Sequence, residues 1–331
     1  MKILVIQTAF IGDLILSTGF FRSISEKYGT RDISVLVNSG TEDILKGNPY
    51  IKEVIPFPKK KIKNNIFKFF EFLRFLKSQN FSICISPHFS HRSSLISFFS
   101  GAVKRIGYKE SGFSFLHTEK VSRPILGIHE INKLSNLIGV STPKKPELYF
   151  ISSEIHKIDL ELKSIGKNYV AIAPSSVWET KRMPAEKFIE LIRMILDKST
   201  LLPLLIGSKS DQALCEEIQK DFGENIKNFS GKTNLQELSY IISGAKVLIS
   251  NDSSPIHIAS AFNIPTVQIY GATVPDFGYT TLSEMHFISE VNGLNCRPCG
   301  IHGGNTCPQN HFRCMKDQNL NEIIKFLLNF E

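Results

Sequence analysis

The sequence lacks several patterns that mark common protein classes. It has no G-x-G-x-x-G run, so the loop that brings backbone close to a dinucleotide pyrophosphate is missing, which disfavours an enzyme dependent on NAD or FAD. No D-x-D pair occurs, so a metal-bridged diphosphate is not indicated. No stretch reaches the roughly 18 uncharged apolar residues of a membrane helix, and any bilayer contact would be peripheral. Six cysteines in 331 residues are too few for a disulfide scaffold.

The composition is that of a globular protein whose charge is unevenly divided. Hydrophobic residues make up 42% and charged residues 21%, which is enough apolar material for two packed cores. Residues 1–150 contain 22 Lys and Arg against 11 Asp and Glu, whereas residues 151–331 contain 17 against 20. This asymmetry predicts that the first half meets an anionic partner, such as nucleic acid, a membrane surface or a phosphorylated substrate. A solubilising surface is the alternative interpretation.

Short β-branched runs alternate with amphipathic helical patterns along almost the whole chain, which is typical of βαβ units and parallel sheets. The alternation pauses at the Pro-rich segment Ser141–Glu147 and then restarts. We therefore predict an α/β protein with two doubly wound domains, residues 1–150 and 151–331. The expected strands are Ile3–Ile6, Ile33–Val37, Glu53–Ile55, Ser82–Ser86, Arg105–Gly107, Tyr169–Ala173, Leu201–Ile206, Val247–Ser250 and Thr266–Tyr270, and the expected helices are 13–28, 64–79, 91–100, 152–165, 185–198, 210–222, 234–243, 254–262 and 321–329.

Two N-terminal segments bear on location and membrane contact. The apolar run after Lys2 begins like a secretory signal, but Asp13 interrupts it and no convincing cleavage site follows, so we expect a cytoplasmic chain. Between Lys59 and Lys77, seven basic side chains accompany the single acid Glu71, with large apolar residues interleaved. This pattern is typical of a helix at a membrane interface, and equally of one whose aromatic face packs in the core. No nucleic-acid-binding module accompanies the basic residues, so nucleic acid is not an expected partner.

Polar residues that follow predicted strands are the first candidates for a site, because open α/β sheets bind ligands at the carboxyl ends of their strands. After the first strand, Gly12 allows a tight turn and Asp13 places a carboxylate at the start of a helix. A plain N-cap is the ordinary interpretation of such an aspartate.

Two strand ends of the second half carry groups suited to a diphosphate. Segment 175–182 supplies two serine hydroxyls followed by a lysine and an arginine, which are hydrogen-bond donors and cations. Segment 252–257 runs into a helix with Pro255 at about the first helical position and a histidine one turn in. A well-capped helix is the alternative for the second segment, but the two together favour a nucleotide-diphosphate site. The candidate residues are Ser175, Ser176, Lys181, Asp252, Ser253, Ser254 and His257.

Four of the six cysteines crowd into one C-terminal segment with the spacing C-x2-C-x7-C-x6-C. Four thiolates at these positions fit a structural zinc site, while reduced thiols that pack a loop are the other interpretation. Cys84 and Cys215 lie in a strand pattern and a helix pattern, so we expect both in the core. The clustered residues are Cys296, Cys299, Cys307 and Cys314.

These motifs, taken in order, resemble those of the bacterial ADP-heptose:lipopolysaccharide heptosyltransferases, glycosyltransferase family 9. The resemblance covers nearly the entire chain, and its cysteine-containing tail is similar to that of heptosyltransferase II-like members. Ser254 departs from the pattern, because the family often has glycine at that place, which puts the closeness of backbone to phosphate in doubt. The matching segments are the Gly12-Asp13 loop, Pro174–Pro184, Asn251–His257 and Tyr270–Phe277.

The resemblance implies a GT-B fold of two facing Rossmann-like domains, with the acceptor bound by the N-terminal one, the nucleotide sugar by the C-terminal one, and a final helix packing back. It implies inverting transfer of heptose from ADP-heptose to the inner core of lipopolysaccharide, a Kdo-lipid A type acceptor, at the inner face of the cytoplasmic membrane. Asp13 falls on the family's proposed general base, and Lys181 with Ser175 and Ser176 on its pyrophosphate contacts. No cofactor is implied. Another nucleotide-sugar donor, a surface-polysaccharide acceptor, and a non-catalytic binding protein are the alternatives.

Overall fold

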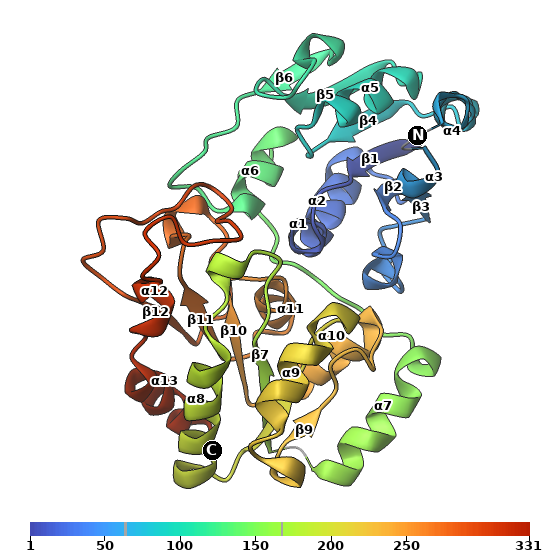
Figure 1. The fold of residues 1–331 in the computed structure, drawn as a ribbon. Coiled ribbons are helices and arrows are strands. Elements are labelled where there is room, and N and C mark those ends of the chain that lie inside the picture. The colour runs from blue at the N-terminus through green and yellow to red at the C-terminus, as the bar shows by residue number, and fades with distance from the viewer. Residues whose placement is uncertain (63–64, 167) are drawn as a thin grey trace. The chain divides into compact units, whose positions relative to one another are not determined.

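The computed structural model describes residues 1–62, 65–166 and 168–331, which form two compact units, Met1–Tyr149 and Phe150–Glu331. Each unit contains a parallel six-stranded sheet with helices packed against it (Figure 1). This confirms the predicted α/β class and the doubly wound architecture. No helix in the described ranges is long and apolar enough to cross a membrane.

The first sheet has the order β3-β2-β1-β4-β5-β6. Its central strand β1 (Ile3–Gln7) is buried along its whole length, because a parallel strand covered on both faces consists of a continuous apolar run. The predicted helix 13–28 is divided at Ser17, whose hydroxyl donates to the carbonyl oxygen of Asp13 (2.7 Å) and competes with the helical hydrogen bond. The other elements are α1 (Ile11–Leu16), α2 (Thr18–Tyr28), β2 (Ile33–Asn38), β3 (Glu53–Phe57), α3 (Lys59–Ile62), α4 (Ile66–Ser78), β4 (Ile83–Ser86), α5 (His91–Phe99), β5 (Lys104–Tyr108), β6 (Glu119–Val121) and α6 (Glu130–Leu137).

The second sheet has the order β12-β11-β10-β7-β8-β9. Counted in each unit's own chain order, both sheets run 3-2-1-4-5-6, the order of nucleotide-binding doubly wound folds. The elements are α7 (Ser152–Ile165), β7 (Tyr169–Ala173), α8 (Ala185–Lys198), β8 (Leu202–Leu205), α9 (Gln212–Gln219), β9 (Lys227–Asn228), α10 (Leu235–Gly244), β10 (Val247–Asn251), α11 (Pro255–Phe262), β11 (Thr266–Tyr270), β12 (His286–Glu290), α12 (Arg313–Lys316) and α13 (Leu320–Leu327).

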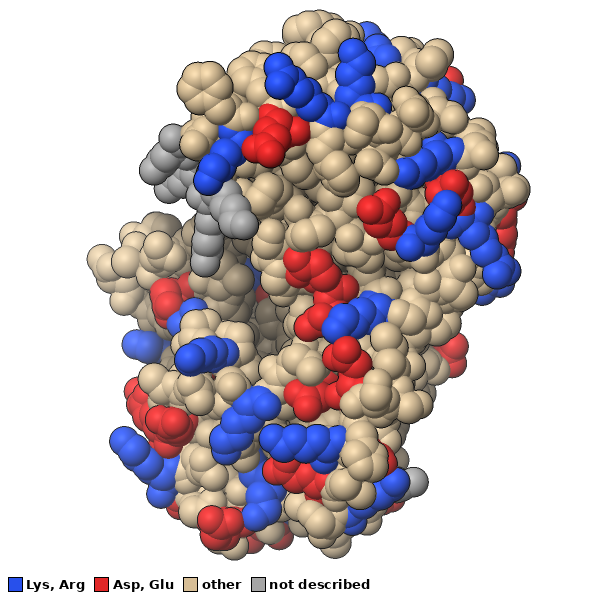
Figure 2. All heavy atoms as spheres, turned by 90° about the vertical axis from the view of Figure 1, so that its right-hand side faces the viewer, with Lys and Arg blue, Asp and Glu red and all other residues tan. Residues whose placement is uncertain are grey.

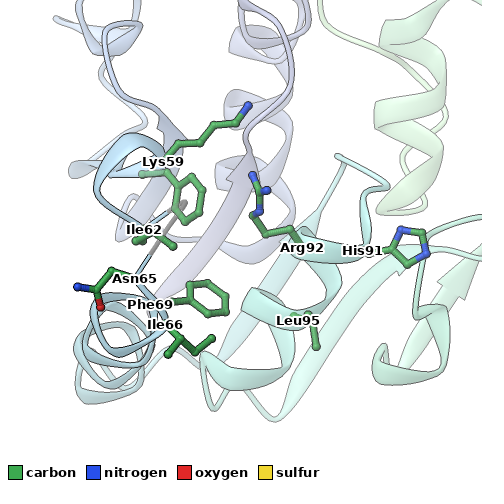
Figure 3. A pocket seen from close by; sticks show the side chains of 9 residues that line it. Lys59, Ile62, Asn65, Ile66, Phe69, His91, Arg92 and Leu95 are labelled. Carbon is green, nitrogen blue, oxygen red and sulfur yellow. The ribbon is translucent and has the colours of Figure 1, made fainter.

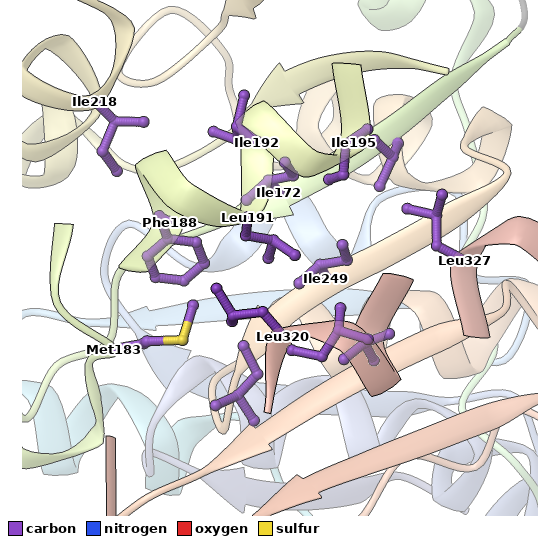
Figure 4. Packing of buried hydrophobic residues seen from close by; sticks show 14 of the residues in the cluster. Ile172, Met183, Phe188, Leu191, Ile192, Ile195, Ile218, Ile249, Leu320 and Leu327 are labelled. Carbon is purple, nitrogen blue, oxygen red and sulfur yellow. The ribbon is translucent and has the colours of Figure 1, made fainter. Parts of the chain in front are cut away.

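One face of the second sheet is covered by α8 and the last helix. Phe188 and Leu191 of α8 pack toward Ile172 and Ile249 of the strands, and Leu327 of α13 completes the cluster (Figure 4). Figure 1 shows α13 beside α8, and the two helices are in contact. The final helix therefore buries its apolar side within the second unit.

The basic segment after β3 forms two helices, and its apolar side chains divide between core and surface. Lys63 and Asn64 lie outside the described residues. Leu73 and Leu76 of α4 are buried, and Phe69 and Phe72 pack against the same core. The exposed fraction is nevertheless 58% for Ile66, 81% for Phe67 and 50% for Phe70. One side of α4 therefore packs in the core, and another side exposes apolar and aromatic side chains to solvent.

Candidate functional site

In each sheet the strand order reverses between the first and the fourth strand of the unit, so the crevice for a ligand opens beside β1 and β4 and beside β7 and β10. Asp13 follows β1, and Thr8 and His88 lie after β1 and β4. In the second unit, Ser175 follows β7 and Asp252 follows β10. The residues chosen from the sequence thus gather at the two switch points, each within its own unit.

Asp13 is the third residue of α1 and is not its N-cap, which is Phe10 and makes no side-chain capping bond. The N-cap interpretation of Asp13 is therefore wrong. Gly12 was expected at a tight turn, but it lies inside the first turn of α1 and is not among the glycines with positive φ. The loop before the helix is fixed by Asn38, whose Nδ2 donates to the carbonyl oxygens of Thr8 and Ala9, both at 2.9 Å.

A histidine that sequence reasoning missed supports the same loop. His88 Nδ1 lies 2.9 Å from the Thr8 hydroxyl and 3.2 Å from the Ser93 hydroxyl. Burial, together with the positive charges of Arg92 and Lys59, lowers the pKa of His88 to about 4. His88 is therefore neutral at pH 7. A histidine directly after a predicted strand was the available signal.

In the second unit Lys181 and Asp252 form an ion pair. Lys181 Nζ lies 2.5 Å from Asp252 Oδ2, and the two side chains are only 15% and 9% exposed. The hydroxyl of Thr273 donates to Asp252 Oδ2 (2.8 Å) and Gln268 Nε2 donates to Oδ1 (3.1 Å). Removing either charge would leave the other poorly compensated, so each fixes the other's position. The sequence placed both residues at the site but did not predict the pair.

The neighbouring cation Arg182 is also engaged. Its Nε donates to the carbonyl oxygen of Ser176 (2.6 Å), and Nη1 lies 2.7 Å from Glu179 Oε1. The Ser175 hydroxyl donates to Asp211 Oδ1 (2.6 Å). The expected pair of cations is thus neutralised by carboxylates, and a diphosphate would have to share these donors.

Segment 252–257 has the expected local structure. Pro255 is the first residue of α11, and Ser254 occupies the N-cap position without a side-chain capping bond. The well-capped helix offered as an alternative is therefore absent. Ser253 Oγ lies 3.2 Å from Ser250 Oγ, and His257 in the first turn of α11 is buried.

The cysteine-containing segment packs against the lysine site, which the sequence did not predict. Arg297 is 6% exposed and donates to the carbonyl oxygens of Gly271 (2.5 Å) and Thr273 (2.8 Å), and it pairs with Glu290 (3.0 Å). The Gly304 N–H donates to the Thr180 hydroxyl (2.8 Å), next to Lys181. The segment therefore contacts the backbone of Thr273, whose hydroxyl binds Asp252, and the side chain of Thr180, the neighbour of Lys181.

The four cysteines of this segment do not fit a zinc site as the structure has them. All are free thiols, and the described residues include no group of three or more His, Cys, Asp or Glu side chains placed to hold a metal. Cys296 Sγ lies 3.8 Å from His311 Nε2, and burial raises the pKa of Cys314 to about 11. Cys84 and Cys215 are fully buried, as predicted.

Comparison with known proteins decides which of the predicted activities this framework serves. The sequence pattern described as "Glycosyltransferase family 9 (heptosyltransferase)" matches residues 69–301. The chain belongs to glycosyltransferase family 9. This membership makes it a glycosyltransferase enzyme, as the ordered motifs predicted.

Sequence relatives agree with the assignment over most of the chain, and solved structures over nearly all of it. Lipooligosaccharide heptosyltransferase 2 of Haemophilus ducreyi is 25% identical over 316 residues, which covers 88% of this chain and 90% of the relative. The structure of Escherichia coli ADP-heptose lipopolysaccharide heptosyltransferase II is similar with a TM-score of 0.78 at 22% identity, covering 99% of both chains. A family 9 enzyme of Veillonella parvula gives a TM-score of 0.86 at 19% identity, covering 99% of this chain and 97% of that one. The GT-B fold class is thereby confirmed.

Proposed function

We propose that this family 9 enzyme transfers a heptose from ADP-heptose to a sugar of the lipopolysaccharide inner core. The observation that carries the proposal is the cluster of Lys181, Asp252 and their partners at the switch point of the second sheet, in a chain whose relatives are named heptosyltransferase 2. A diphosphate needs hydrogen-bond donors and positive charge at such a place.

Asp13 acts as the general base of an inverting displacement in this proposal. The hydroxyl oxygen of the acceptor attacks the anomeric carbon of the heptose, its proton passes to the Asp13 carboxylate, and the bond from that carbon to the ADP oxygen breaks. Asp13 is partly exposed in the first turn of α1, behind a loop fixed by Asn38, which suits proton transfer to its carboxylate from a hydroxyl in the crevice.

Lys181 stabilises the charge that develops on the leaving ADP. An ammonium has three N–H donors, and the contact with Asp252 uses one of them, so two remain for diphosphate oxygens. Ser175, Ser176, Ser253, Ser254 and His257 complete the proposed donor site around it. The proposal routes no step through a metal ion.

The decisive experiment mixes purified protein with ADP-heptose and a Kdo-lipid A type acceptor and measures ADP release together with the mass of the glycolipid product. We expect ADP and a product heavier by one heptose. Turnover with another nucleotide sugar in preference to ADP-heptose would contradict the donor assignment. Binding of ADP without any release from ADP-heptose would contradict the enzymatic proposal.

We further propose that the enzyme works in the cytoplasm, with its first unit in peripheral contact with the inner membrane. On the face of this unit that Figure 2 presents, Lys and Arg side chains are spread over the surface, with some Asp and Glu side chains among them. The basic residues and exposed aromatics of α4 are a composition suited to an anionic lipid interface. Vesicles with anionic lipid should bind the protein better than neutral vesicles at low salt, and equal binding would contradict the membrane contact.

A further inference from the structure

A pocket of about 710 Å³ lies in the first unit, beside the basic helices. Its apolar wall consists of the end of β3, the end of α3, the start of α4 and the first turns of α5, and its volume is within the range of about 300–1,000 Å³ typical of small-molecule sites. Figure 3 shows Phe69 reaching from α4 toward α5, with Leu95 of α5 and Ile66 of α4 nearby. The apolar lining residues are Phe57, Ile62, Ile66, Phe69 and Leu95.

Two cations lie together at one side of this pocket. In Figure 3 the nitrogen ends of Lys59 and Arg92 lie on the same side, away from Ile66 and Leu95. Neither side chain forms an ion pair with an acid within the described ranges. The Arg92 guanidinium instead lies 5.7 Å from the centre of the Phe57 ring. Both charges contribute, after the larger effect of burial, to the lowered pKa of the adjacent His88. An anion is therefore the missing partner at this side.

The apolar surface continues from the pocket to the outside of α4. Ile66 lines the pocket and is also 58% exposed, and Phe67 and Phe70 beside it are 81% and 50% exposed. A water-soluble anion would account for the two cations but not for this aromatic surface. A molecule with a hydrocarbon chain and an anionic headgroup, presented by a bilayer on which α4 rests, accounts for both.

We propose that the pocket binds one acyl chain of an anionic membrane phospholipid, with the phosphate of its headgroup on Lys59 and Arg92. This inference rests on the proposed membrane contact and adds a defined lipid site to it. The chain lies against Phe69 and Leu95, while Phe67 and Phe70 enter the interface around it. The lipid would hold the first unit at the membrane independently of the sugar that is transferred.

The test uses lysophosphatidylglycerol, a single-chain anionic lipid, in a series of increasing chain length, each member below its micelle concentration. If the chain enters the pocket, affinity measured by calorimetry should rise about fourfold per added methylene until the pocket is filled. Glycerol phosphate, which lacks the chain, should not bind detectably. An affinity independent of chain length would overturn the proposal.

Matched variants separate the pocket from general electrostatics. Arg92→Gln and Arg74→Gln each remove one exposed charge, so folding should survive both, but only Arg92 lines the pocket. We expect Arg92→Gln to weaken lipid binding roughly tenfold, as the loss of a charge-assisted hydrogen bond should, and Arg74→Gln to change it less than twofold. Leu95→Asn should flatten the dependence on chain length, with Leu160→Asn, an exposed leucine of α7, as its control. Equal effects of the two arginine variants would refute the headgroup site.

Transfer assays distinguish failure of this inference from failure of the proposed function. With a deacylated, water-soluble acceptor, Arg92→Gln and Leu95→Asn should turn over within about twofold of the original protein, because such an acceptor reaches the enzyme without a membrane lipid. If transfer proceeds but lysophosphatidylglycerol does not bind, only the lipid site is refuted. If the lipid binds but no heptose is transferred, only the proposed function is refuted. If the acylated acceptor binds in a Leu95-dependent manner and the phospholipid does not, the pocket belongs to the acceptor and the proposal fails.

Discussion

The two sheets have the same strand order, but the side chains at their carboxyl edges differ in how they are bound. At the second edge, Lys181, Asp252 and Arg182 are each bound by other side chains or carbonyl groups. At the first edge, Lys59 and Arg92 border an apolar pocket and have no acidic partner in the described residues. A set of interlocked polar contacts suits a small, highly charged donor that must be held in one position, while an open apolar and cationic surface suits a large amphiphile. The same scaffold thus serves different ligands through the residues that follow its strands.

The largest effect should come from Asp13. Replacing it with Asn keeps its size but removes the proton acceptor, so we expect the rate of heptose transfer to fall by about 10²- to 10⁴-fold. Binding of ADP should remain nearly unchanged, because the donor contacts are assigned to the second unit. Single-turnover product formation and calorimetry with ADP measure the two quantities.

Asp43→Asn serves as the control, because Asp43 is an acid of the same unit in a surface ion pair with Lys46, which contributes little to stability. Its rate should match the original protein. If Asp13→Asn retained the original rate, the assignment of the base would be wrong. The first edge would then have no assigned catalytic residue to set against the donor site of the second edge.

Lys181→Ala should have the next largest effect, on donor binding. It removes charge-assisted bonds to the diphosphate and leaves Asp252 largely buried without its cation, so we expect KM for ADP-heptose to rise roughly 10- to 100-fold. Lys187→Ala removes a lysine of α8 whose partner Glu190 is half exposed, and it should leave KM unchanged. An unchanged KM in Lys181→Ala would show that the interlocked pair is structural only.

Arg297→Met tests whether the cysteine-containing segment supports the donor site. The change removes bonds to three carbonyl oxygens and leaves Glu290 without its cation, so the second unit should lose about 2–3 kcal/mol of unfolding free energy. Urea titration monitored by Trp178 fluorescence measures this loss, since the only tryptophan lies in the second unit. Arg313→Met breaks an exposed pair with Asp317 in the same segment and should cost less than about 0.5 kcal/mol. Similar losses in both variants would contradict this supporting role.

The sequence alone predicted the features that depend on local pattern, namely the buried strands and the polar residues that follow them. Continuous apolar runs identified β1 and β7, and the residues after them led to Asp13, Ser175 and Lys181. The expectations missed three edge strands: β6, which is short, polar and largely exposed, the two-residue β9, and β12, which has one buried residue. An edge strand needs no buried alternation. The expectations also missed contacts between distant segments, such as Lys181 with Asp252. Lys181 and Asp252 meet because β7 and β10 are neighbours in the sheet, and the order of strands cannot be read from either motif alone.

The smallest predicted effect is a difference between the two units in how much folding stability each loses at low pH. In the first unit, burial lowers the pKa of both His88 and His117 from about 6.5 to about 4, so between these values the unfolded chain binds more protons than the folded one. Stability is then complete above about pH 6.5 and falls as the pH drops toward 4, by at most about 1.4 kcal/mol per pH unit for each histidine.

In the second unit burial lowers the pKa of His302 as well, whereas two histidines of the first unit, His88 and His117, are brought to about 4. Hydrogen exchange measured by peptide mass spectrometry at pH 7 and pH 5, corrected for intrinsic rates, should therefore show larger loss of protection in peptides of residues 1–149 than of 150–331. His117→Gln should reduce this difference, whereas His156→Gln, at an exposed position of α7, should not. Equal loss of protection in both units would mean that the buried histidines are compensated elsewhere, and the contrast between the units would be confined to their ligand edges.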